Sequence, residues 1–116
     1  MTRPPMMLLK GTLDVLILKT LSWGPTHGYA VSRWIQQVTS DELKIEEGAL
    51  YPALRRLEEK ELIDATWKTT ATGREAKVYR LTAAGRAQLQ VEVGAWSRYV
   101  SAMSRALEAR PNGAIA

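Results

Sequence analysis

Tyr51 and Arg55 lie four residues apart in the segment Glu47-Gly-Ala-Leu-Tyr-Pro-Ala-Leu-Arg-Arg-Leu-Glu58. On an α-helix this spacing brings two side chains to the same side. Arginine can donate two hydrogen bonds to guanine O6 and N7, and tyrosine can reach a phosphate or a base edge. The pair is therefore a candidate for contacting a DNA groove. For Arg55, an ion pair with Glu59 is the simpler alternative.

A basic segment follows this candidate helix. The chain has a net charge of +4, and residues 67–86 hold five bases against a single acid, so this short stretch accounts for the whole excess. The bases are Lys68, Arg74, Lys77, Arg80 and Arg86. Such a patch is typical of phosphate binding, and a solvated hairpin explains it equally well. We expect Arg74 and Lys77, with Lys68 beside them, to meet phosphates or the minor groove, whereas Arg80 can serve structurally on the outer strand face.

Two residues outside this segment are further candidates for DNA contact. Lys44 lies just before the candidate helix, where it can add a phosphate contact. Tyr29 lies near the start of an earlier predicted helix and can either donate to a phosphate or pack against its neighbours.

Catalytic chemistry finds no support in the sequence. Cysteine is absent and His27 is the only histidine. No thiolate ligand set, metal-binding cluster or nucleophile–base pair can be assembled from these residues. We therefore predict that the protein is not an enzyme and has no metal and no cofactor. His27 is expected to cap a helix or to form a local hydrogen bond.

Three helices are expected to position the candidate side chains. Residues 12–22 form the first, capped by Thr12 and ended by Trp23-Gly-Pro25, because proline cannot continue the hydrogen-bond ladder. Residues 26–38 form the second. The third covers residues 46–60, and its core face is Leu50, Ala53, Leu54 and Leu57. Pro52 indicates that this helix starts late or bends, and Arg56 at the core edge is expected to pair with acids.

Two short strands are predicted after the third helix, over residues 63–68 and 77–81, with a turn over residues 69–74. A helix followed by a basic hairpin is the order of a winged helix-turn-helix. The predicted fold class is mainly α with a small β-hairpin. Residues 1–82 would form the winged helix-turn-helix unit, and residues 83–108 a long C-terminal dimerisation helix capped by Thr82.

The fourth helix repeats apolar residues at spacings of four and three, namely Leu89, Val93, Trp96, Val100, Met103 and Leu107. This is the a/d seam of a coiled coil over nearly three heptads. A helix this long extends beyond so small a core, so we predict that the seam joins two copies into a homodimer. Alternatively the seam folds back on the first helix of its own subunit, and both arrangements can hold. Gly94 allows close approach of a backbone or ligand.

Trp96 is a candidate for binding a small effector. Core packing is the default role of a tryptophan on such a seam. If the dimer leaves a gap, two symmetry-related indoles could sandwich a planar aromatic ligand, with Val15, Val93 and Val100 completing the wall. The other tryptophans, Trp23, Trp34 and Trp67, are interpreted as packing groups.

Length and composition set the frame for these interpretations. The 116 residues suffice for one small domain, and the 46% hydrophobic content is ordinary for a globular protein. No apolar run approaches the ~18–20 residues of a membrane span. Residues 1–10 lack the apolar stretch of a signal peptide, and the absence of cysteine fits a reducing compartment. We expect a cytoplasmic protein without a membrane partner, ending in a disordered tail over residues 109–116.

Several motifs together resemble the PadR family of bacterial transcription regulators: His27-Gly-Tyr29, Gly48-Ala-Leu-Tyr-Pro-Ala-Leu54, Arg56-Leu-Glu58 and Tyr79-Arg-Leu-Thr82 with Gly85. The similarity extends from about Gly11 to Trp96 in the family's order and spacing. The short C-terminus resembles the small subfamily with a single C-terminal dimerisation helix, which includes phenolic-acid and multidrug-responsive repressors. Glu61, where the family usually has glycine, and Glu75 among the bases of the hairpin tip depart from the pattern.

The resemblance implies a homodimeric winged-helix repressor that binds a dyad-symmetric, double-stranded operator and is released by a small molecule. The competing hypothesis is a winged-helix dimerisation or adaptor module that binds a protein partner. Salt distinguishes the two, because duplex binding falls steeply with ionic strength.

Overall fold

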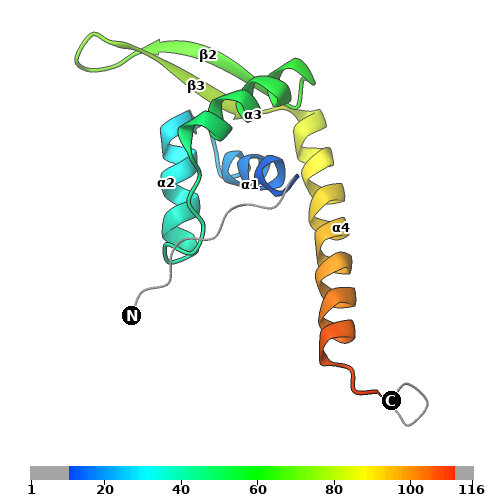
Figure 1. Ribbon diagram of the computed structural model, residues 1–116. Helices are drawn as coiled ribbons and strands as arrows, with labels where there is room; N and C mark the ends of the chain where they lie inside the picture. Colours follow the sequence, from blue (N-terminus) through cyan, green and yellow to red (C-terminus); the bar gives the residue numbers. More distant parts are fainter. Residues whose placement is uncertain (1–10, 112–116) are drawn as a thin grey trace.

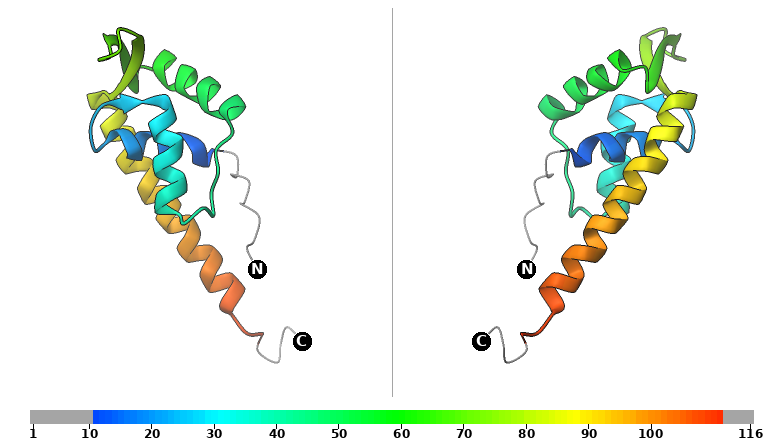
Figure 2. Two further views of the ribbon diagram at one scale, coloured as in Figure 1. Left: turned by 90° about the vertical axis from the view of Figure 1, so that its left-hand side faces the viewer. Right: turned by 90° about the vertical axis from the view of Figure 1, so that its right-hand side faces the viewer.

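The computed structural model describes residues 11–111, and the two chain ends lie outside them, together with most of the predicted tail (Figure 1). The elements follow in the order α1 (Thr12–Leu21), β1 (Thr26–His27), α2 (Gly28–Val38), α3 (Glu47–Glu59), β2 (Ile63–Thr69), β3 (Glu75–Leu81) and α4 (Ala83–Glu108). α1, α2 and α3 surround one core beside the small sheet, and α4 projects away from it (Figures 1 and 2). The predicted fold class is confirmed.

α3 supplies much of the core. Its predicted core face, Leu50, Ala53, Leu54 and Leu57, is at most 1% exposed. These side chains belong to one core with residues from every other helix and from both long strands, including Ile17, Leu18, Leu21, Val31, Ile35, Ile63, Leu81 and Leu89. The helix begins at Glu47 and contains Pro52, so the prediction of a late start is wrong. The burial of this apolar face outweighs the one backbone hydrogen bond that proline cannot donate.

The start of α1 differs from the sequence-based prediction. Gly11, with a φ of 88°, is the residue before the first helical one, and as glycine it provides no side-chain cap. Thr12 is itself the first helical residue, so its prediction as the cap is wrong. Glycine suits this left-handed conformation because it has no Cβ.

A third strand was missed by the sequence analysis. β1 pairs antiparallel with β3, with Thr26 opposite Tyr79 and His27 opposite Val78. The sheet order is β1-β3-β2. His27 precedes α2 and makes no side-chain cap hydrogen bond. A two-residue strand carries no alternation in the sequence, so only the long-range pairing identifies it.

The end of α3 turns sharply into β2 through Glu61, whose φ is 60°. The Leu62 amide donates to the Leu57 carbonyl at 3.0 Å, and the Glu61 amide donates to the Glu58 carbonyl at 3.0 Å. This pair of bonds is a Schellman motif, which usually places glycine at the left-handed position. Glu61 replaces the glycine that is usual in the family, and the turn still forms. Its side chain, however, lies at a left-handed backbone position that favours glycine.

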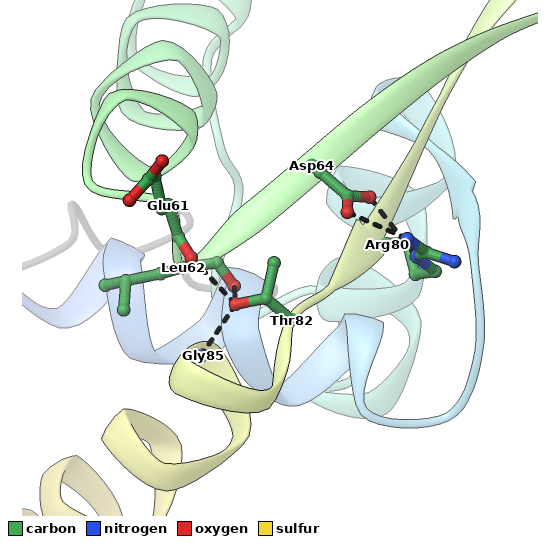
Figure 3. A network of polar contacts seen from close by, with 6 residues as sticks. All are labelled: Glu61, Leu62, Asp64, Arg80, Thr82 and Gly85. Carbon is green, nitrogen blue, oxygen red and sulfur yellow. Dashed lines mark hydrogen bonds and ion pairs between the residues drawn. The ribbon is translucent and has the colours of Figure 1, made fainter.

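The start of α4 is joined to this turn by Thr82 (Figure 3). The Thr82 amide donates to the Leu62 carbonyl at 3.1 Å, and the Thr82 hydroxyl lies 2.8 Å from the Glu61 carbonyl oxygen and 3.0 Å from that of Leu62. The same hydroxyl accepts from the Gly85 amide at 3.0 Å, which confirms Thr82 as the helix cap. A Cβ on Gly85 would overlap the Leu62 carbonyl and lie 2.7 Å from Leu81 Cδ1. Glycine is therefore required where α4 crosses the turn.

The predicted seam of α4 divides into two parts. Leu89 is 8% exposed and belongs to the core of its own chain, so folding back onto the same subunit holds at this position. The five seam residues that follow are 40–77% exposed. Past Leu89 the helix thus presents an uncovered apolar stripe. None of the helices within residues 11–111 combines the length and apolar character needed to cross a membrane.

Candidate nucleic-acid interface and ligand pocket

The outer face of α3 carries the two side chains predicted to contact DNA bases. Tyr51 is 43% exposed and Arg55 is exposed, opposite the buried stripe of the same helix. Within residues 11–111, Arg55 forms no hydrogen bond or ion pair, so the expected alternative of a pair with Glu59 is not adopted. Its five N–H donors are available to a ligand.

Tyr51 of α3 contacts the start of α2, where Tyr29 also lies. A Cβ on Gly28 would lie only 3.1 Å from Tyr51 Cε1, so the Tyr51 ring rests against this glycine. Tyr29 is 55% exposed and stacks on His27, with ring centroids 5.3 Å apart. His27 Nδ1 lies 3.3 Å from the Lys77 carbonyl oxygen on the neighbouring strand β3, so its contact is long-range and not the local hydrogen bond that was expected. The start of α2 thus joins α3 and the hairpin.

The hairpin of β2 and β3 has two different faces. Asp64 lies opposite Arg80 and accepts two hydrogen bonds from its guanidinium, at 2.9 and 3.2 Å. These bonds and the carboxylate charge raise the pKa of Arg80 above its usual value. Residues alternate across a strand, so Lys68 lies on this same outer face. The structural interpretation of Arg80 is confirmed.

Lys77 lies on the opposite face, which is continuous with the buried side chains Tyr79 and Leu81. Its ammonium is 3.2 Å from the Glu58 carboxylate of α3 and 5.3 Å from the Tyr79 ring centre. Burial raises the pKa of Tyr79, and the Lys77 charge opposes that shift. Lys77 therefore already has a partner, which the sequence analysis did not predict.

The hairpin tip presents Arg74 to solvent. The Thr70 amide donates to the Arg74 carbonyl at 2.7 Å, and Thr70 Oγ1 accepts from the Arg74 amide at 3.2 Å, so the backbone of the tip is held in place. Gly73 adopts a φ of 82° within this turn. Lys44 is exposed in the loop before α3. Neither Arg74 nor Lys44 forms an ion pair with another described residue.

A pocket of about 410 Å³ lies between α1 and α4. Its lining consists of Gly11, Thr12, Val15, Glu92, Ala95, Trp96 and Tyr99. The structure thus brings together Val15 and Trp96, as predicted, whereas Val93 and Val100 are not part of this lining. Glu92 and Tyr99 were missed, although Tyr99 lies three residues after Trp96, one helical turn away.

Two tryptophans do not have the packing role expected of them. Trp23 is 72% exposed and Trp67 is 64% exposed, whereas Trp34 packs against the core as predicted. Trp23 follows the end of α1, and the Lys19 ammonium lies over its ring, 4.9 Å from the ring centre. Arg56 pairs with Asp14 at 3.4 Å, which confirms its expected pairing with an acid.

Helices α2 and α3, followed by a hairpin with an exposed cationic tip, define a winged helix-turn-helix protein. Across residues 11–111, no group of acids and histidine could hold a metal ion. Residues 17–91 match the sequence model of the Transcriptional regulator PadR-like family. The chain belongs to this family and is a DNA-binding transcriptional regulator rather than an enzyme.

Individual relatives and solved structures are similar to this chain over most of its length. The chain is 34% identical over 90 residues to a Lysinibacillus sphaericus protein named uncharacterized protein X, covering 78% of this chain and 83% of the relative. A transcriptional regulator from Clostridium thermocellum superposes with a TM-score of 0.76 at 27% identity, covering 83% of this chain and 93% of the other. A PadR family transcription regulator from Clostridium difficile superposes with a TM-score of 0.71 at 29% identity, covering 84% of this chain and 99% of the other.

Proposed function

We propose that the protein is a homodimeric, ligand-responsive repressor that binds an inverted-repeat operator in the cytoplasm. The observation that carries this proposal is the apolar stripe of α4, whose five residues after Leu89 are 40–77% exposed in the single chain. A second copy of α4 would remove this stripe from water in the a/d geometry of a coiled coil. Residues 83–108 then form the dimerisation helix, and the preceding residues form the DNA-binding unit.

In the proposed complex α3 enters the major groove with Tyr51 and Arg55 toward the bases. Both side chains are exposed on one face of a helix whose other face is fixed in the core. Around this face Tyr29, Lys44 and Arg74 contact phosphates, and Lys68 contributes from the outer face of the hairpin. Lys77 takes part by exchanging Glu58 for a phosphate, because a half-exposed ion pair contributes only about 0–1 kcal/mol.

The operator is the first experimental target. Sequencing DNA fragments recovered with the protein should yield an inverted repeat whose half-sites lie about 34 Å apart or a multiple of that, as a dyad of two α3 helices requires. Arg74→Ala should weaken binding to operator and random DNA alike and reduce the salt slope by about one unit, because a phosphate contact carries no base information. A change in base preference without a change in slope would contradict the role of Arg74.

The pocket between α1 and α4 is the proposed effector site. Trp96 and Tyr99 offer two aromatic rings with centroids 6.0 Å apart, and Val15 adds an apolar wall. A planar aromatic compound fits this surface, and the Glu92 carboxylate favours one that carries a positive charge. Across the proposed dimer, the second Trp96 would complete the sandwich together with Val93 and Val100.

Release of DNA follows if the ligand prefers a dimer geometry that misplaces the two α3 helices. The coupling is limited to that difference in affinity, typically ~1–3 kcal/mol. Ligand should quench tryptophan fluorescence and lower operator affinity in the wild type. Trp96→Ala should lose both responses while it still dimerises and binds DNA. A Trp96→Ala protein that is monomeric, combined with no quenching in the wild type, would assign Trp96 to packing alone.

A further inference from the structure

Trp67 is a large apolar side chain that lies outside the hydrophobic core of its own chain. It lies on β2 and is 64% exposed. Its side chain forms no hydrogen bond and no ring or cation contact with another described residue. An exposed indole of this size on a small domain marks a candidate contact surface.

The strand register places Trp67 on the side of the hairpin that faces α3. Ile63 is buried and Ala65 packs against the core, and alternation puts Trp67 on the same face two residues further along. Its direct partner on β3 is Lys77, whose ammonium reaches Glu58 of α3. Trp67 therefore lies on the core-facing side of β2, two residues beyond the last one that packs against the core. The hairpin of β2 and β3 extends beyond the helices (Figure 1).

This position is continuous with the proposed DNA surface. Tyr51 and Arg55 lie along α3, Arg74 lies at the hairpin tip, and Trp67 occupies the stretch between them. The cation nearest to it in the register, Lys77, is already paired with Glu58. The indole itself offers apolar area and no charge, which suits the deoxyribose rings of a DNA backbone, while Lys77 contacts the neighbouring phosphates once it exchanges Glu58 for a phosphate.

We propose that Trp67 packs against the sugar rings of the operator backbone and is a DNA-contacting residue of this protein. The proposal rests on the proposed placement of α3 and the hairpin on DNA. A sugar contact buries apolar area, releases no counterions and is blind to base sequence. It adds affinity to every duplex without adding to its salt dependence.

The test measures the affinity for operator and for random duplex between 50 and 200 mM salt. Trp67→Ala should bind both duplexes about tenfold more weakly with an unchanged salt slope, and Trp67→Phe should retain most of the affinity. Trp23→Ala is the matched control, because Trp23 is 72% exposed, slightly more than Trp67, but lies at the end of α1. It should bind DNA as the wild type does.

The proposal would be overturned by unchanged affinity in Trp67→Ala, by a shallower salt slope, or by an equal loss in Trp23→Ala. A change in the oligomeric mass of Trp67→Ala would instead assign the indole to an interface between copies, which also overturns it. The midpoint of thermal unfolding of each variant shows whether weaker DNA binding comes from a lost contact or from a destabilised fold. Failure of the wild type to bind any duplex would refute the DNA placement itself, and Arg74→Ala reports on that placement independently of Trp67.

Discussion

α3 and α4 carry the same kind of apolar stripe, but the stripe of α3 is buried and most of the stripe of α4 is exposed. The four stripe residues of α3 are at most 1% exposed, whereas the five seam residues of α4 past Leu89 are 40–77% exposed. Periodicity alone predicts both stripes equally well. The difference shows that a pattern identifies an apolar face but not the molecule that covers it. The chain buries the stripe of α3 itself and leaves that of α4 to the proposed second copy.

Leu54→Ala should produce the largest effect, because it removes a fully buried side chain from α3. We expect a loss of about 2–5 kcal/mol in the free energy of unfolding, measured by urea denaturation. Leu107→Ala deletes the same atoms from a side chain that is 77% exposed, and in a monomeric background it should cost less than about 1 kcal/mol. Equal losses would remove the distinction between the two stripes.

Val100→Glu should separate the subunits without unfolding them. A carboxylate on the seam would have to lose its water in the proposed interface, so the dimer dissociation constant should rise at least about 100-fold. Mass by light scattering measures this, and circular dichroism should show the helices intact. Ala102→Glu, with the same added charge on an exposed position of α4 outside the seam, should leave the mass unchanged. An unchanged mass in Val100→Glu would refute the proposed dimer.

The two glycines of α4 sharpen the comparison within one helix. Gly85→Ala should destabilise the fold by about 1–3 kcal/mol, because its Cβ meets the Leu62 carbonyl. A Cβ on Gly94 meets nothing within 4 Å in the single chain, so Gly94→Ala in the Val100→Glu monomer should gain up to ~1 kcal/mol from helix propensity. Thermal denaturation of both variants checks the opposite signs. Loss of dimer affinity in Gly94→Ala alone would place a second backbone beside Gly94.

Glu61→Gly should give the smallest effect, and a stabilising one. Glu61 holds a φ of 60° in the Schellman turn, and glycine removes the Cβ strain while it loses more chain entropy on folding. The balance should raise the free energy of unfolding by about 0.5–1 kcal/mol, measured by urea denaturation. Glu61→Ala keeps the Cβ and should show no such gain. A destabilised Glu61→Gly would mean that the Glu61 side chain itself stabilises the turn.

Local features of the fold were predictable from the sequence. The stripe of α3, the break after Val38 and the Thr82 cap depend on residues close together in the chain, and all three appear in the structure. β1 could not be predicted, because its two residues become a strand only through pairing with β3, about fifty positions later. The contact between Glu58 and Lys77, which joins α3 to the hairpin, was not predicted for the same reason, because the two residues are far apart in the sequence.

The sequence predicted which residues belong to the candidate site, but not how all of their side chains are placed relative to the core. Tyr51, Arg55 and Arg74 are exposed where the helix and the turn place them. Trp67 was interpreted as a packing group because tryptophan is usually buried, yet its strand continues past the core. Whether a large apolar residue has something to pack against depends on where the core ends, and composition does not contain that information.

The contacts of Thr82 attach α4 rigidly to the end of α3, so α4 acts as a lever arm. Its hydrogen bonds to the carbonyls of Glu61 and Leu62, with the tight passage of Gly85, leave little freedom for α4 to pivot against the end of α3. The 26 residues of α4 span about 39 Å. In the proposed dimer, a change of about 5° in the angle between the two copies of α4 would therefore change the separation of their far ends by about 3 Å, by the same helix rise. A ligand wedged between the two copies of α4 would thus change the spacing of the two α3 helices by a similar distance.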